Sequence, residues 1–524
     1  MQIAWLSDKV VNYQKKTLLL IGIATVLRVI MASTLELGNA EAYYWAYSLH
    51  IQWNYFDHPP IVAWLIRLTT VNLLIHNELF VRIGAIISSA ICTWLIFKIG
   101  AVINNLQTGW FAALLYTSSI YGSIVAGTFI LPDSPQLVFW LSSVLLLIKL
   151  TQSTAYDPKS NLLWCFFGIM SGLCIMSKAS GIFLWFGIAS YVLLVDRSWL
   201  NYRGIYLSAI IALIITSPII IWNLQNNFIS YKFYGNRISL IGAGMHAGLF
   251  IKELLAVILI TNPVNFFLIC GNLLWAFKGK TSIDNKAIQL LLFCSIPLIV
   301  VISFISLFRE TLPHWPEPGY SCLLILPAIK LSSVFKSKKR NIPITIKVAL
   351  AFMLILAVSD IFVTNYYPGT SSEQKQGFYT GKGDFTLDMY GWKEASEKFD
   401  SLFRSDVERR IMPYSTSIIV TNWFPAAHID FYIATKTKQQ TFGIGGILNL
   451  HQYYWMNEYK KQLKNEDNAY FIVPSNLFKD ETLSEVINNF NYYDMPLVIY
   501  QYRSGIICKQ LYVFRLKGYR KYKP

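Results

Sequence analysis

Long apolar segments separated by short polar segments dominate the first two thirds of the chain. A helix needs roughly 20 residues to cross about 30 Å of hydrocarbon. About eleven segments approach that length, and a transmembrane helix is predicted in each of them, at about 17–34, 80–98, 110–126, 134–151, 161–176, 180–195, 204–222, 249–276, 287–307, 319–334 and 345–364. This pattern predicts an all-α polytopic membrane domain over residues 1–365.

The pattern changes after residue 365, where the chain becomes polar and rich in Tyr, Asn and Lys. Strand-like runs alternate there with helix-like runs. The strand-like runs are at 415–423, 468–475 and 506–514, and the helix-like runs are at 391–403, 425–435 and 483–490. We therefore predict a second domain of α/β type over residues 366–524.

The basic residues predict the orientation of the membrane domain, because Lys and Arg collect in short cytoplasmic loops. With the N-terminus inside, alternation of the spans puts the strongly basic loops inside. The most basic of these loops contains Lys330, Lys336, Lys338, Lys339, Arg340 and Lys347. The loop at 35–79 and the α/β domain are then predicted to lie outside the cytoplasm.

Composition supports a membrane protein and excludes several other classes. The 524 residues are 54% hydrophobic and 14% charged, against roughly 25% charged in an average soluble domain. Membrane-anchoring lysines explain the net charge of +16, and no basic face with interleaved aromatic residues predicts a nucleic-acid partner. Six of the seven cysteines fall in apolar segments, which argues against a disulfide framework or a zinc site.

The predicted outer loops carry most of the polar and aromatic motifs of the chain. In order, these are EAYYW at 41–45, YFDHPPIVAWLI at 55–66, LPDSP at 131–135, SKASG at 177–181, SPIIIWNLQNNF at 217–228 and PHWPEPGY at 313–320. This ordered set resembles the GT-C-fold glycosyltransferases that use polyprenyl-phosphate sugars. The likeness is greatest to the bacterial members related to protein O-mannosyltransferases and to the lipid A aminoarabinose transferase, and it covers about residues 15–365.

The resemblance implies an enzyme of the bacterial inner membrane with its active site on the periplasmic side. Its partners would be a polyprenyl-phosphate sugar donor, the lipid bilayer, and an acceptor that is either an envelope glycolipid such as lipid A or a protein hydroxyl. The reaction would be an inverting sugar transfer.

The acidic residues of the motifs are the candidates for the catalytic base. The family pattern has an Asp-Glu pair at the start of the first outer loop, whereas this chain has Ala40 and Glu41. Glu41 is the first candidate and Asp133 the second; the acceptor could also need no base, or the chain could be an inactive relative. Each acid also has a structural interpretation, Glu41 as a helix-start acid and Asp133 as a helix cap.

The basic residues of the motifs are the candidates for binding the donor phosphate. His58 stands where the aminoarabinose transferase-like relatives have Lys before Pro-Pro, a residue that the resemblance implies contacts the carrier phosphate. Lys178, Arg237 and Arg309 are further candidates in outer loops. The alternatives are an incidental loop histidine and a lysine that extends to the membrane surface.

A third group of residues is predicted to line the sugar or acceptor. It consists of Asn39, Tyr43, Tyr44, Tyr55, Asp57, His314 and Trp315. The aromatic residues among them could instead form an interfacial belt. No ligand spacing indicates a metal, and no other cofactor is predicted.

A transporter or flippase of a lipid-linked sugar is the competing function. Such a protein should carry polar residues at mid-membrane in several helices, often within internal repeats. Here the polar residues gather at one predicted surface, and no internal repeat is evident. The pattern therefore favours an enzyme.

Overall fold

The computed structural model describes residues 2–153, 158–277, 285–335 and 342–520. It divides into two compact units. The first, here called the membrane unit, comprises Met1–Ala32, Gln52–Leu65 and Arg82–Ala357; the second, the α/β unit, comprises Ser33–Ile51, Ile66–Val81 and Val358–Pro524. Two segments of the first predicted outer loop therefore belong to the α/β unit. A boundary at residue 365 between separately folding domains stays a prediction.

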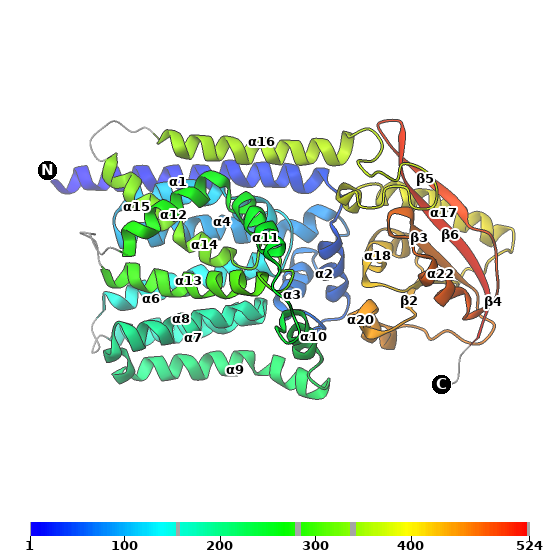
Figure 1. Ribbon diagram of the computed structural model, residues 1–524, viewed down its shortest axis with the longest axis horizontal. Helices are drawn as coiled ribbons and strands as arrows, with labels where there is room; N and C mark the ends of the chain where they lie inside the picture. The colour runs from blue at the N-terminus through cyan, green and yellow to red at the C-terminus, as the bar shows by residue number, and fades with distance from the viewer. Residues whose placement is uncertain (1, 154–157, 278–284, 336–341, 521–524) are drawn as a thin grey trace. The chain divides into compact units, whose positions relative to one another are not determined.

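Seven described helices are long and apolar enough to cross a membrane (Figure 1). They are α1 (Gln2–Thr34), α4 (Glu78–Ile103), α6 (Asp133–Thr151), α7 (Pro158–Ser177), α9 (Arg203–Gln225), α13 (Asn285–Ser306) and α16 (Ile344–Tyr366). The pair α11 (Ala247–Thr261) and α12 (Pro263–Phe277) makes an eighth span if it is counted as one, although it bends by 102°. The bend falls where Asn262 has a φ of +80° and Pro263 supplies no backbone N–H, so the helix cannot continue.

The other three predicted spans are helical but short or broken. They correspond to α5 (Leu106–Ser118) with the π-turn η1 (Tyr121–Val125), to η2 (Ala179–Ile182) with α8 (Phe183–Leu194), and to α14 (Glu317–Leu323) with α15 (Ile325–Val334). The mainly helical, polytopic fold is thus confirmed, and every predicted segment is helical. Of the basic loop, Lys336, Lys338, Lys339 and Arg340 lie outside the described residues.

Packing within the membrane unit explains which apolar side chains are inside. Trp140 and Leu141 of α6 and Trp164 of α7 are buried, and Trp164 packs against Trp199 with ring centres 5.3 Å apart. On α9, by contrast, Leu213 and Ile214 are 62% and 66% exposed. A soluble protein rarely exposes so broad an apolar face, whereas lipid would cover it.

The chain order brings several loops of the membrane unit to one end of its bundle. Helices α6, α7, α8 and α9 follow one another with short connections; α7 packs against α6 and α9, and α8 packs against α13. The start of α6 and the ends of α7, α9 and α13 consequently gather at the same end, where the short helices α3 (Ile61–Thr69) and α10 (Ile229–Ile238) also lie (Figure 1).

The α/β unit contains a six-stranded mixed sheet. Its strands are β1 (Ser417–Val420), β2 (Thr441–Gly443), β3 (Ala469–Pro474), β4 (Phe490–Tyr493), β5 (Leu497–Arg503) and β6 (Ile506–Tyr519). Their order is β2-β1-β3-β6-β4, with β5 also paired to β6; β2, β1 and β3 are parallel, and β6 is antiparallel to its neighbours. Helices α2 (Asn39–Leu49), α17 (Trp392–Glu408), α18 (Trp423–His428) and α22 (Asp480–Ile487) belong to this unit.

The predicted α/β class is confirmed, and the three predicted strands are β1, β3 and β6. The sequence pattern did not predict β2, β4 and β5. β2 has only three residues, and three of the four residues of β4 are exposed, so neither has the alternation of apolar and polar positions by which a strand is recognised.

Candidate active site

A buried ion pair lies at the centre of the site in the membrane unit. Asp133 begins α6 and Lys178 directly follows α7, so the packing of these two helices brings the residues together. Lys178 Nζ lies 2.9 Å from both carboxylate oxygens of Asp133. The two side chains are only 8% and 2% exposed. The hydroxyl of Tyr121 also donates to Asp133 Oδ1, at 3.2 Å.

His58 lies close to this pair in a loop that is held by α10. The hydroxyl of Tyr234 donates to the carbonyl oxygen of Asp57 at 2.5 Å and lies 3.3 Å from His58 Nε2. Burial, and then the positive charge of Lys178, lowers the pKa of His58 to about 3, although Asp133 acts in the opposite direction. The imidazole of His58 is therefore neutral near pH 7.

His314 approaches the same pair from the loop between α13 and α14. Burial lowers the pKa of His314 to about 4; the charge of Asp133 opposes this shift, while Lys178 and Arg237 add to it. Arg237, in the last turn of α10, places its guanidinium 5.0 Å from the centre of the Trp315 ring, as in a cation–π contact. The structure thus brings together five predicted site residues of the membrane unit within electrostatic range: His58, Asp133, Lys178, Arg237 and His314.

The hydrogen-bond donors of this cluster suit an anionic ligand. Lys178 and Arg237 contribute two positive charges, Asp133 and Asp57 contribute negative charges, and the two imidazoles are neutral near pH 7. The donors of Lys178, Arg237 and the imidazoles suit a phosphate group, whose oxygens accept hydrogen bonds from ammonium, guanidinium and imidazole groups.

Other predicted residues of the membrane unit support the loops. Arg309 Nε donates to the carbonyl oxygen of Ser239, which follows α10, at 2.8 Å. The Tyr55 hydroxyl accepts a hydrogen bond from the backbone N–H of Gln52 at 3.1 Å. Arg309 is not among the charges that shift the pKa values of His58 and His314, so it is not counted in the cluster.

The predicted residues of the first outer loop up to Tyr44 lie in the α/β unit. Glu41 Oε2 accepts a hydrogen bond from the backbone N–H of Gly38 at 2.9 Å, which is the capping interaction of a helix-start acid. Asn39 Nδ2 donates to Asp388 Oδ2 at 2.7 Å. A catalytic role of Glu41 stays a prediction.

The two tyrosines of this segment are packed against the α/β unit. The Tyr43 hydroxyl accepts from the backbone N–H of Gln452 at 3.1 Å, and the ring centres of Tyr43 and Tyr44 are 6.0 Å apart. The predicted site residues therefore divide between the two units.

Sequence reasoning missed three polar residues of the membrane unit, Tyr121, Tyr234 and Glu317. Glu317 is 1% exposed and accepts a hydrogen bond from the hydroxyl of Thr261. It lies between two prolines in the PHWPEPGY motif, directly before an apolar segment. An acid in that position could have been identified from the sequence as a candidate site residue. Tyr121 had none, because it lies inside an apolar run.

The described part of the chain contains no cluster of three or more His, Cys, Asp or Glu side chains that could hold a metal ion. The expectation that the protein needs no cofactor stays a prediction.

Comparison with known proteins agrees with the resemblance that the motifs indicated. The family model for dolichyl-phosphate-mannose-protein mannosyltransferase matches residues 57–222. Lipid A galacturonosyltransferase RgtD of Rhizobium johnstonii is 24% identical over 290 residues, which are 55% of this chain and 59% of that protein. The match therefore spans less than two thirds of the length of that relative.

Solved structures show the same fold. ArnT from Cupriavidus metallidurans in the apo state has a TM-score of 0.62 and 14% identity, covering 95% of this chain and 98% of that chain. ArnT from the same organism bound to undecaprenyl phosphate has a TM-score of 0.60 and 14% identity, covering 95% and 97%. The chain has an ArnT-like GT-C fold, as the sequence motifs predicted.

Proposed function

We propose that this protein is a glycosyltransferase that moves a sugar from a polyprenyl-phosphate donor to an acceptor of the cell envelope. The observation that carries the proposal is the compact cluster of Lys178, Arg237, His58 and His314 around Asp133 at one end of an apolar helix bundle. A lipid phosphate places its charge at the end of such a bundle and its chain along the bundle's apolar surface. One relative and one family model named for glycosyltransferases, and an ArnT structure that holds undecaprenyl phosphate, support this assignment.

The cations would act on the phosphate that leaves. In the proposed transfer, an acceptor oxygen attacks the anomeric carbon from the face opposite the phosphate, and the bond between that carbon and the phosphate oxygen breaks. The configuration inverts, and the carrier departs as a phosphate anion. Lys178 and Arg237 would stabilise the charge that develops on this anion.

Asp133 is better suited to hold Lys178 than to accept a proton. Both of its oxygens already accept hydrogen bonds from Lys178, and one of them also accepts from Tyr121. We assign Asp133 as a positioning residue on this basis. The proton of an acceptor hydroxyl would then pass to solvent, and an acceptor that is already anionic would need no base.

The proposed acceptor is lipid A or another envelope glycolipid, with a protein hydroxyl as the second candidate. The curated relative acts on lipid A by its name, and the family model is named for transfer to proteins. The proposed location is the bacterial inner membrane, and the placement of basic loops supports a site on the side away from the cytoplasm, which is the periplasmic side there.

Mass spectrometry of envelope lipids and glycans from cells with and without the gene tests the function. We expect one glycoform to disappear with the gene and to return with the unaltered chain. It should not return with Lys178→Met. If the protein were instead a flippase, loss of the gene would make the lipid-linked sugar accumulate on the cytoplasmic side of the membrane. Supplying the donor on the periplasmic side by another route would then restore sugar transfer without this protein. An unchanged set of glycoforms would contradict the proposal.

Donor binding can be measured separately on the purified full chain. We expect native mass spectrometry to detect undecaprenyl phosphate bound to the unaltered chain and to lose that complex in Lys178→Met. An inactive relative would retain the lipid complex and transfer no sugar, so the two measurements distinguish a dead enzyme from a wrong assignment.

A further inference from the structure

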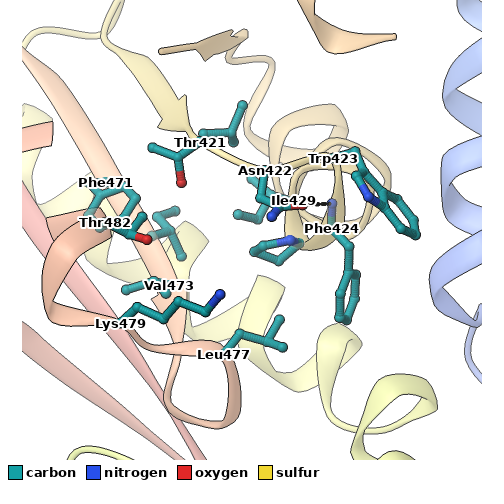
Figure 2. A pocket seen from close by; sticks show the side chains of 13 residues that line it. Thr421, Asn422, Trp423, Phe424, Ile429, Phe471, Val473, Leu477, Lys479 and Thr482 are labelled. Atoms are coloured by element: carbon teal, nitrogen blue, oxygen red, sulfur yellow. Dashed lines mark hydrogen bonds between the residues drawn. The ribbon is translucent and has the colours of Figure 1, made fainter. Parts of the chain in front are cut away.

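A crevice in the α/β unit opens at the carboxyl ends of two parallel strands, β1 and β3 (Figure 2). From β1 the chain crosses to β2 on one side and then returns to β3 on the other side of β1. This reversal of strand order is a topological switch point, where open α/β sheets bind their ligands. The crevice has a volume of about 200 Å³.

Three polar side chains in this crevice have no hydrogen-bond or ion-pair partner among the described residues. They are the hydroxyl of Thr421, the hydroxyl of Thr482 and the ammonium group of Lys479. Thr421 is only 9% exposed, and Figure 2 shows its oxygen directed into the crevice, with Lys479 extending from the opposite wall. Lys479 is exposed and Thr482 is half-buried, so solvent reaches these groups in the crevice, and a ligand that enters could bond to all three polar groups without breaking a hydrogen bond within the protein.

The remaining lining is apolar. The side chains of Ile429, Phe471, Val473, Leu477 and Phe424 surround the polar groups (Figure 2). Asn422 lies at the edge, where its Oδ1 caps α18 through the backbone N–H of Phe424 at 3.2 Å. Its amide nitrogen is then available as one more donor.

These features select a ligand by its chemistry. Apolar side chains next to hydroxyl, amide and ammonium groups match one sugar ring, which has an apolar C–H face and an edge of hydroxyl groups. The volume is below the roughly 300 Å³ at which pockets for drug-sized ligands begin, which favours a single ring. Lys479 adds one positive charge, which would pair with one anionic substituent.

Two other ligand classes fit less well. The turn after β1 contains Trp423, Phe424 and Pro425, where a nucleotide site has glycines that let the backbone approach the phosphates. The first turn of α22 contains Asp480 and Glu481, which would repel the several negative charges of a polyphosphate more strongly than the single charge that Lys479 can pair with. An acyl chain would leave the polar groups without partners.

We propose that the crevice between the ends of β1 and β3 is a saccharide-binding site for one acidic hexose unit. It would bind a glycan of the envelope at a site separate from the donor phosphate cluster. The proposal does not require the transfer reaction, because it rests only on the α/β unit.

Saturation-transfer NMR on the full chain in detergent tests this site with four probes: glucuronate, glucose 6-phosphate, glucose and inorganic phosphate. We expect glucuronate to bind more tightly than glucose, and inorganic phosphate not to bind. Lys479→Ala should weaken glucuronate binding about tenfold, as for the loss of a hydrogen bond to a charged group, and leave glucose unchanged. Thr421→Val should weaken both sugars about threefold.

Lys436→Ala is the matched control, because Lys436 is an exposed lysine of the same unit outside the crevice. Equal binding of glucose 6-phosphate and glucuronate would identify the charge, not the carboxylate, as the recognised group. Binding of inorganic phosphate alone, sugar binding that neither variant changes, or no sugar binding would each overturn the proposal. If the chain binds no sugar in this experiment but still binds undecaprenyl phosphate, the saccharide site is wrong and the proposed function stands. If the chain binds glucuronate but not undecaprenyl phosphate, the proposed function is wrong and the saccharide site stands.

Discussion

Replacing Lys178 with Met tests the ion pair on which the site in the membrane unit depends. Met keeps much of the apolar stem of Lys178 but removes the ammonium group. Among the described residues, the carboxylate of Asp133, 2% exposed, then keeps only the hydrogen bond from Tyr121. Removing one partner of a buried pair costs about 3–5 kcal/mol, because the remaining charge is buried without compensation. We expect a loss of that size in the free energy of unfolding of the full chain, titrated with SDS in mixed micelles.

The double variant Lys178→Met/Asp133→Asn separates stability from function. It removes both charges, so at least half of the lost stability should return, whereas binding of undecaprenyl phosphate should not. Lys252→Met is the control, since Lys252 pairs with Glu310 at 2.6 Å but both side chains are more than half exposed. Its stability should match that of the unaltered chain. A stable Lys178→Met variant, or a double variant no more stable than the single one, would refute the reasoning.

Three further predictions concern the loops and the orientation. Tyr234→Phe removes the hydroxyl beside His58 and should weaken undecaprenyl phosphate binding roughly fivefold, by about 1 kcal/mol; unchanged affinity in native mass spectrometry would contradict it. Burial lowers the pKa values of His58 and His314 to about 3 and about 4, so below about pH 6.5 the unfolded chain binds more protons and stability should fall. The loss at about pH 5 should be roughly 1–2 kcal/mol for each, allowing for their partial exposure, and His314→Gln should reduce it; stability that does not change with pH would exclude this effect. Gln376 is exposed, and Gln376→Cys can be made in a background that lacks the exposed Cys270. The new thiol should react with a reagent that reaches the periplasm but does not cross the inner membrane of intact cells. Reaction only when the reagent is supplied from the cytoplasmic side would contradict the proposed orientation.

The helical membrane fold was predictable because a bilayer imposes a simple rule on sequence. Each spanning segment must be apolar for about 20 residues, and this rule can be read without knowing any neighbour. The breaks were harder to predict. Asn262 with its positive φ marks the bend between α11 and α12, but Pro218 and Pro297 lie within continuous helices, so proline alone does not locate a break.

The candidate site was predictable in its residue types and only partly in its geometry. The motifs indicated that Asp133, Lys178 and His58 belong to polar loops at one surface. They did not indicate that Lys178 would pair with Asp133, because 45 residues separate them and only the packing of α6 against α7 joins them. Tyr121 and Tyr234 had no signal of their own among the 31 tyrosines of the chain.

By itself, the sequence determined which segments are apolar, where the basic loops fall and which motifs carry polar chemistry, since each of these is a property of neighbouring residues. Only the tertiary structure decided that Glu41 caps a helix in the α/β unit, that Lys178 binds Asp133, and that the ends of β1 and β3 enclose a crevice with unpartnered polar groups. The physical reason is that hydrogen bonds and ion pairs act over a few ångströms in space. The same partners can lie at any distance along the chain, so a one-dimensional pattern identifies the groups but not their pairing.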